Sequence, residues 1–391
     1  MKKALATILA LVMAIGLCSV SWATGSTLPT AENGVIKLTE NVTLTERWEV
    51  AANTEITLDL NGYSITSAGQ VIMNNGKLTI TDNKGGGKIV STGSQAIGVG
   101  SNSVTNIQKA IVESVEGAVI TGRAIGAIIN IYDGTFSASD NAVIAGNGSD
   151  REGTGNTINI SGGVFNGKIT TPGYVACGIY APWKDNINVT GGTFNITGGA
   201  GIVARAGNVT VTNAVFNTTG NATGKVGDSR VVVPCSAIVF DSQANYPAMN
   251  NDSVIHVVSG KFNSEMNAVS MIKNDNETDR VAVTGGTFST DVKEYLAEGK
   301  ILQKNGDTYT AVTNSGITSG TYTAKPTVPD GYKVVENTDG TFTVEKVGGY
   351  YYYQPTTDTK TTDTKGSPKT FDAGIALYVG MAPVSYTHLR A

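Results

Sequence analysis

The sequence is poor in charge, in histidine and in cysteine. Only 15% of its 391 residues are charged, and it contains two histidines and three cysteines. The net charge of −4 provides no basic surface for a polynucleotide, so nucleic acid is not an expected partner. Outside the C-terminal tail there is one histidine, His256, which cannot build an ordinary zinc site with two separated cysteines. No metal and no cofactor are therefore predicted.

Helix-forming residues are also sparse. Leucine and glutamate are few, whereas Asn, Thr, Ser, Val and 48 glycines make up much of the chain. This balance favours strands and turns. Because the repeated part of the chain has no helical periodicity, ankyrin, tetratricopeptide and HEAT repeats are excluded, and the leucine ladder of leucine-rich repeats is missing.

What the sequence does contain is one phrase in six near-copies between residues 129 and 291. Each copy has alternating apolar residues, then a turn rich in Gly, Asp or Asn, then a phenylalanine. In the copy NINVTGGTFN, Ile187 and Val189 point to one side of a predicted strand, and Phe194 returns to that side after the turn. The six anchor positions are Phe136, Phe165, Phe194, Phe216, Phe262 and Phe288.

These anchors are separated by 29, 29, 22, 46 and 26 residues, a period that indicates a solenoid. Several short strands per coil predict an all-β parallel β-helix over residues 24–291, with the phenylalanines stacked in an internal ladder. The gap of 46 residues is expected to hold two coils, one of them lacking the aromatic around residues 230–240. Residues 33–60 are the candidate N-terminal cap, and four strands are expected over residues 35–67.

Two similar segments, 286–312 and 320–347, overlap and follow the last repeat. Each runs from Gly-Thr-aromatic to two strands joined by Asn-Gly or Asp-Gly, which is a strong β-hairpin signal. One short helical turn is expected at 292–299. We therefore predict small C-terminal β modules over residues 292–347.

The two ends of the chain carry signals for export and display. A charged start, an apolar run and a small-residue cleavage site at 21–23 predict a signal peptide over residues 1–23. Residues 348–371 are polar and Thr-rich, as in a linker, and residues 372–391 form an anchor-like tail. The protein is expected to be exported to the cell surface or the extracellular space.

Two cysteines remain after removal of a signal peptide. Cys177 and Cys235 each precede a similar apolar strand, and a third such strand lies between them at 201–205. If the three strands stack, the cysteines lie two coils apart, at about 9.5 Å. This separation exceeds the roughly 7 Å that a disulfide can bridge, so two buried, unpaired thiols are predicted.

The segment TLDLNGYSI at 57–65, the repeated xIxVxGGTF phrase and the 286–312 unit together resemble a known group. They are similar to exported bacterial surface proteins with a pectin-lyase-like right-handed parallel β-helix, often from Gram-positive anaerobes. The resemblance covers most of residues 33–312 and implies a cell-surface β-helix. It implies no single activity, because such helices occur in lyases, hydrolases, adhesins and tail spikes.

The tail GSPKTFDAGIALYVGMA is similar to the lead-in of C-terminal wall or membrane anchors. Ser367 and Phe371 depart from the usual sorting motif, and the apolar run is too short to span a bilayer. We expect the natural chain to continue into a membrane helix after about Met381, which would be its one link to a membrane. The ending SYTHLRA resembles an adapter-derived artefact.

The sequence contains no evident set of catalytic residues. A lyase or hydrolase on a β-helix needs acids in register on one face, yet Asp133, Asp185, Asp228 and Asp241 fall at different phases of the repeat. No catalytic residue is predicted; the weak candidates are Asp228, Arg230 and Arg205. The alternative for Arg205 is an outward strand position or an ion pair with Asp228 on a neighbouring coil.

Aromatic residues in loops are the candidate contacts for carbohydrate. The candidates are Tyr174, Tyr180, Trp183 and Tyr246. Their rings could stack on the apolar faces of sugars, or they could cover the side of the solenoid and hold loops in place.

Three functions follow from these observations. The first is a non-catalytic cell-surface β-helix for adhesion or glycan binding, whose partner is an extracellular polysaccharide or a host or cell-wall glycan. The second is a polysaccharide lyase or glycoside hydrolase acting on a long glycan. The third is a structural surface spacer.

Overall fold

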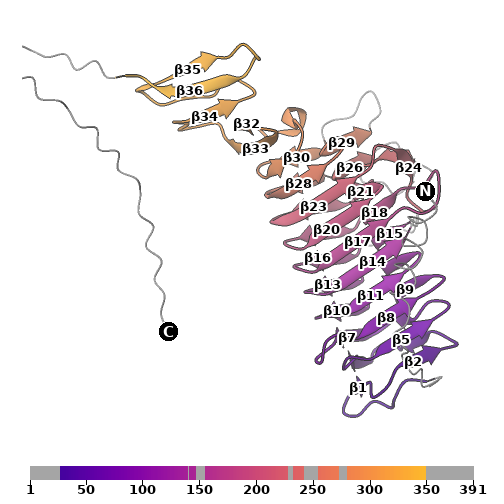
Figure 1. Cartoon of the computed structure of the whole chain (residues 1–391). Coiled ribbons are helices and arrows are strands. Elements are labelled where there is room, and N and C mark those ends of the chain that lie inside the picture. The colour runs from indigo at the N-terminus through magenta and orange to yellow at the C-terminus, as the bar shows by residue number, and fades with distance from the viewer. Residues whose placement is uncertain are drawn as a thin grey trace, which may run out of the picture. The chain divides into compact units, whose positions relative to one another are not determined.

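The computed structural model describes residues 27–139, 141–146, 155–227, 232–241, 254–272 and 280–348. In these residues the chain passes through three sheets in turn and then repeats, so that each strand pairs in parallel with its equivalent one coil away (Figure 1). The predicted all-β parallel β-helix is confirmed. The predicted signal peptide, the linker apart from Gly348, and the anchor-like tail lie outside the described residues.

The three sheets are numbered by their order within a coil. Sheet 1 contains β1 (Val35–Lys37), β4 (Glu55–Asp59), β7 (Lys77–Thr81), β10 (Val104–Ile107), β13 (Ile128–Ile131), β16 (Thr157–Ile160), β19 (Asn186–Val189), β22 (Asn208–Val211), β27 (Val254–Val257) and β30 (Val281–Val283). The parallel part of sheet 2 contains β2 (Val42–Leu44), β5 (Ser64–Ser67), β8 (Lys88–Ser91), β11 (Ile111–Ser114), β14 (Thr135–Ser139), β17 (Val164–Lys168), β20 (Thr193–Thr197), β23 (Ala214–Thr219), β28 (Gly260–Ser264) and β31 (Thr287–Phe288). Sheet 3 contains β3 (Trp48–Val50), β6 (Ile72–Asn74), β9 (Gln95–Val99), β12 (Gly117–Ile120), β15 (Ala142–Ala145), β18 (Ala176–Ala181), β21 (Gly199–Ala204), β26 (Ile238–Asp241) and β29 (Val269–Ile272).

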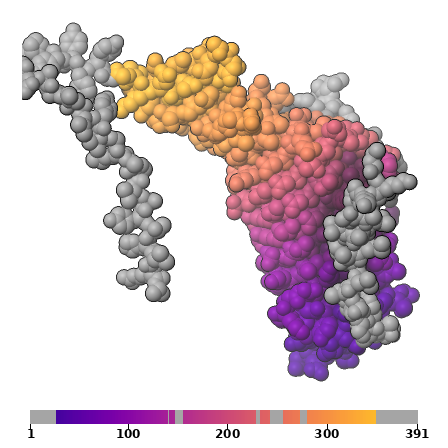
Figure 2. All heavy atoms as spheres, in the orientation of Figure 1, coloured from indigo at the N-terminus to yellow at the C-terminus, as the bar shows by residue number. Residues whose placement is uncertain are grey.

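The core lies inside the coils and follows from the alternating pattern of each strand. Ile158 of β16 pairs in register with Ile187 of β19, and both side chains are fully buried. The anchor phenylalanines form the predicted ladder, with neighbouring ring centroids between 4.4 and 5.5 Å apart and nearly parallel planes. Figure 2 shows successive coils following one another without a break in the packed surface.

The longest gap between anchors does not hold an extra coil. Phe216 stacks directly on Phe262, with ring centroids 5.5 Å apart, and β23 pairs with β28. The expectation of two coils there was wrong, because the surplus residues leave the solenoid after β23. They form an outer hairpin, β24 (Thr223–Lys225) and β25 (Val232–Pro234), before the chain returns as β26.

The N-terminal end also differs from the prediction. Residues 35–67 contain five strands, β1 to β5, where four were expected. The candidate cap at 33–60 forms the first coil and the start of the second, since β1, β2 and β3 pair in parallel with β4, β5 and β6. Regular coils therefore begin at Val35.

The predicted C-terminal hairpins are both confirmed. After β31 comes one 3-10 turn, η1 (Lys293–Tyr295), within the segment expected to be helical. The strands β32 (Lys300–Asn305) and β33 (Thr308–Thr313) then pair antiparallel, and β33 pairs with β31 at the end of sheet 2. The second module adds β34 (Gly320–Tyr322), β35 (Tyr332–Glu336) and β36 (Phe342–Lys346) to the same sheet.

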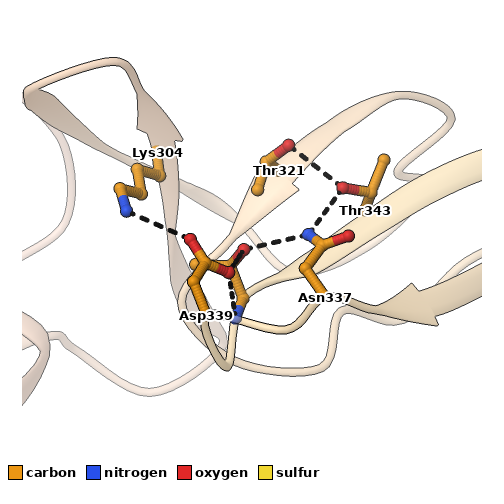
Figure 3. A network of polar contacts seen from close by, with 6 residues as sticks. Lys304, Thr321, Asn337, Asp339 and Thr343 are labelled. Carbon is orange, nitrogen blue, oxygen red and sulfur yellow. Dashed lines mark hydrogen bonds and ion pairs between the residues drawn. The ribbon is translucent and has the colours of Figure 1, made fainter.

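A polar network joins the two hairpins (Figure 3). Lys304 of β32 approaches the carboxylate of Asp339, in the turn of the second hairpin, at 3.5 Å. Asn337 donates hydrogen bonds to the hydroxyls of Thr341 and Thr343, each at 2.9 Å. Hydrogen bonds from the Thr341 hydroxyl and backbone N–H lower the pKa of Asp339, and Lys304 lowers it further.

Candidate functional site: a pocket beside Tyr174

The outer hairpin reshapes one corner of the solenoid, where sheet 2 turns into sheet 3. Its strand β24 follows β23 but reaches an earlier coil, the one that contains β18. There the carbonyl of Lys225 accepts a hydrogen bond from the backbone N–H of Val175 at 2.9 Å. Val226 and Val233 are buried against the outer side of sheet 3, in a second hydrophobic cluster that also contains Cys177 and Cys235. The hairpin thus covers part of sheet 3 and forms a wall at its edge.

A pocket of about 410 Å³ lies at this corner. It is built from three consecutive coils and the outer hairpin, and is lined by Val115, Glu116, Ser139, Asn141, Thr171, Tyr174 and Gly227. Val115 is 42% exposed and Tyr174 is half-buried, so an apolar wall is accessible to a ligand. Serine, asparagine and glutamate side chains beside an aromatic ring can hydrogen-bond the hydroxyls of a sugar while the ring contacts its apolar face.

Gly227 lies close to Asn141 in the wall of this pocket. Its φ is 48°, a left-handed conformation that a β-branched or bulky residue rarely adopts. A Cβ atom added there would lie 2.8 Å from Oδ1 of Asn141, closer than such contacts allow. The Asn141 carboxamide is itself oriented by the backbone N–H of Ala142, which donates to Oδ1 at 2.7 Å.

Arg205 has a structural role in a buried ion pair. It follows β21, and its Nε lies 3.0 Å from Oδ2 of Asp241, at the end of β26 on the next coil. The two side chains are 3% and 0% exposed. Arg205 also donates a hydrogen bond to the hydroxyl of Tyr180 at 2.9 Å. The alternation of β21, with Ile202 and Ala204 in the inner core and Val203 in the outer cluster, places Arg205 on the outer side of sheet 3, as expected, but it is buried there. A neighbouring coil supplies an acid, Asp241, whereas Asp228, the expected partner, lies outside the described residues.

The buried acids of the described chain hold the backbone in place. Asp82 accepts hydrogen bonds from the backbone N–H groups of Gly62 and Gly87, at 2.7 and 2.6 Å. Asp185 accepts two from Asn156, at 2.8 and 3.0 Å. Among the described residues, no group of three or more His, Cys, Asp or Glu side chains could hold a metal ion.

The predicted aromatic residues separate into three cases. Tyr174 lines the pocket, and Tyr180 is partly buried and bound to Arg205. Trp183 is only 1% exposed, so the predicted stacking of its ring on a glycan is not possible in this conformation. Tyr246, like Asp228 and Arg230, lies outside the described residues.

Both predicted thiols are buried and unpaired. The strand β18, with Cys177, pairs with β21, and β21 pairs with β26, which follows Cys235, so the predicted stacking is confirmed. Burial raises the pKa of both thiols above the ordinary value. They therefore stay protonated at neutral pH and are poor nucleophiles.

One exposed aromatic was missed at the sequence level. Tyr132 is 46% exposed and follows β13 on the outer side of sheet 1. The equivalent positions in other copies are Ser161, Thr190, Thr212, Val258 and Thr284. Comparing the copies position by position could have found it, since Tyr132 is the one tyrosine at this position of the repeat.

No protein-family model, no curated protein and no solved structure matches this chain. In the part of the chain that the structure describes, no helix is long and apolar enough to cross a membrane.

Proposed function

We propose that this protein is an exported, non-catalytic cell-surface β-helix that binds glycans, and that the Tyr174 pocket holds a sugar residue. The observation that carries the proposal is the pocket itself, where one aromatic ring and an exposed valine face serine, asparagine and glutamate side chains. Such a mixture of one apolar wall, neutral hydrogen-bonding groups and one carboxylate that can accept hydrogen bonds from hydroxyls matches the two-sided chemistry of a pyranose ring.

The rest of the sequence supports the same proposal. The resemblance to bacterial surface proteins with pectin-lyase-like helices fits a signal peptide at one end and a Thr-rich linker with an anchor-like tail at the other. The acids Asp82, Asp185 and Asp241 have structural partners, so a paired-carboxylate site is not favoured in this part of the chain. Adhesion to an extracellular polysaccharide, or to a host or cell-wall glycan, is the function proposed.

The test is native electrophoresis of the full chain through gels that contain plant, mucin or cell-wall polysaccharides. We expect one class of polymer to retard the protein without loss of polymer staining. Tyr174→Ala should weaken binding of a short oligosaccharide of that polymer by about fivefold, the effect of losing one stacked ring, whereas Tyr174→Phe should retain it. Val232→Ala, an exposed position on β25 outside the pocket, is the matched control.

Other outcomes would overturn the proposal. A cleared zone in the polymer along the lane would show a polysaccharide lyase or hydrolase. Absence of retardation in every gel would favour a protein partner or a surface spacer. Equal binding by Tyr174→Ala and the unmodified protein would remove the pocket from the proposal.

A further inference from the structure

The outer face of sheet 1 is regular and uncharged over five coils. Alternation along each strand turns every second side chain outwards. From β10 to β22 the outward side chains, including the residue after each strand, are Val104, Asn106, Gln108, Ile128, Asn130, Tyr132, Thr157, Asn159, Ser161, Asn186, Asn188, Thr190, Asn208, Thr210 and Thr212. None carries a charge. Lys109 and Asp133 lie in turns beyond the strands, and Lys77, on the adjacent strand β7 beside Val104, is paired with Glu55.

A ladder of asparagine side chains runs along the middle of this face. Asn130 donates to Asn106 at 2.8 Å, Asn159 donates to Asn130 at 2.8 Å, and Asn188 donates to Asn159 at 2.9 Å. The carboxamides are therefore held in one orientation, so that a ligand would find them already ordered.

The ladder leaves hydrogen-bonding capacity facing outwards. A carboxamide has two N–H donors and an oxygen with two lone pairs. An interior member such as Asn130 or Asn159 uses one donor and accepts one hydrogen bond within the ladder. Each coil thus presents a further donor and acceptor, repeated at the strand spacing of about 4.8 Å.

Two exposed apolar side chains, Ile128 and Tyr132, lie on the same face. On β13 and the residue after it, Ile128 is 39% exposed and Tyr132 is 46% exposed, with Asn130 between them. Because neighbouring coils have Gln108 and Ser161 beside Tyr132, its ring projects from a row of polar side chains. This is an arrangement in which a ring of a ligand can stack while its edge groups reach the ladder.

Sheet 2 provides an internal comparison. Its outer face carries a similar ladder, in which Asn217 donates to Asn195 and Asn263 donates to Asn217, both at 2.9 Å. That face, however, also presents Lys168 and Lys261, and no aromatic side chain accompanies its ladder among the described strands. The asparagine ladder is therefore common to both faces. The sheet 1 face differs from the sheet 2 face in having uncharged side chains around the ladder and in having Tyr132.

We propose that the sheet 1 face from β10 to β22 is a second binding surface, which takes an extended, uncharged polysaccharide chain along the axis of the solenoid. The inference rests on the proposed glycan-binding function for its class of ligand, but it uses a face separate from the Tyr174 pocket. These five strands carry no cation that could compensate an acidic polymer for the water lost from its carboxylates. The hydroxyl groups of a neutral polymer, in contrast, can form hydrogen bonds with the rows of amide and hydroxyl side chains. A polysaccharide that lies parallel to the solenoid axis would contact an amide or hydroxyl side chain of the middle row at every coil.

The test compares two variants of the full chain in gels containing a neutral polymer, with a β-glucan, a xylan and a mannan as probes, and polygalacturonate as the acidic probe. We expect a neutral polymer to retard the protein, and Tyr132→Ala to weaken this retardation by about fivefold. Ser161→Tyr, which adds a ring one coil further along, should strengthen it. Val164→Ala, at an exposed apolar position on sheet 2, is the control that should change nothing.

The outcomes separate this inference from the function on which it rests. If Tyr174→Ala weakens binding and Tyr132→Ala does not, the glycan-binding proposal stands and the second surface is refuted. If Tyr132→Ala weakens retardation by the polymer but leaves the binding of a short oligosaccharide at the pocket unchanged, the second surface is supported. Preferential retardation by polygalacturonate, or by no neutral polymer, would overturn the inference. Circular dichroism of each variant excludes loss of folding as the cause.

Discussion

The coils and the C-terminal hairpins are built from strands of similar length but are stabilised in different ways. In the coils, each strand pairs in parallel with its equivalent, and fully buried side chains such as Phe165 and Phe194 stack from coil to coil. The hairpins pair antiparallel around a small cluster of Ile301, Ile317, Tyr322 and Val344, and they are tied together by a surface network. The comparison teaches that a repeat gains its stability from equivalent neighbours, whereas the hairpins combine a small cluster of their own with one attachment to the last coil, through Leu302, Ala311 and the pairing of β33 with β31.

The largest expected effect comes from breaking the ladder in the middle of the coils. Phe194 is fully buried and stacked between Phe165 and Phe216. Phe194→Ala should lower the free energy of unfolding by about 3–5 kcal/mol, because it removes a large side chain from a core that cannot collapse around the cavity. Urea unfolding measures this change. A loss below about 1 kcal/mol would show that the coils do not depend on the ladder.

The second effect tests whether the buried ion pair holds adjacent coils together. Asp241→Ala removes an acid that pairs with the buried guanidinium of Arg205 and should cost about 3 kcal/mol of unfolding free energy. The double variant Arg205→Met with Asp241→Leu should recover most of that loss, because both charges of the pair are then removed. Thermal unfolding of the single and double variants decides this. Unchanged stability in Asp241→Ala would argue that the pair contributes nothing to the packing of the coils.

The smallest effect is expected in the hairpins and depends on pH. The pKa of Asp339 is lowered in the folded state from its ordinary value of 3.8. Its ionised form is thus favoured by folding, so its stabilisation is present above about pH 3.8 and is lost as the pH falls through the lowered value. The protection of the β35 and β36 amides, measured as hydrogen exchange relative to the intrinsic rate at each pH, should fall over that range while the coils stay protected. The same fall in Asp339→Asn would show that another group is responsible.

The architecture was largely readable from the sequence, because its signals are local and repeated. Strand alternation and the spacing of Phe136, Phe165 and Phe194 predicted the ladder, and an Asn-Gly or Asp-Gly pair marked each hairpin. The gap after Phe216 was misread, since the length of an insertion does not say whether the chain completes a coil or leaves the solenoid. Only the pairing of β23 with β28 distinguishes the two.

The candidate site was less predictable. Tyr174 was among the predicted aromatics, but its partners Val115 and Asn141 come from two earlier coils and share no local pattern with it. Trp183 looked like a loop aromatic and is buried, because burial of a ring outside the repeat depends on which segments cover it. The exposure of Tyr132 was not predicted, because the residue lies inside the repeated phrase, whose alternation marks it only as one outward position among many.

The sequence by itself determined the all-β class, the parallel stacking of coils and the inward direction of the phenylalanines. These properties follow from side-chain alternation and from a period that brings like residues together. Only the tertiary structure decided which acid pairs with Arg205, where the outer hairpin folds back, and which side chains of different coils meet at Tyr174. Such contacts join residues far apart in the chain, and their free energy depends on a three-dimensional register that no single segment encodes.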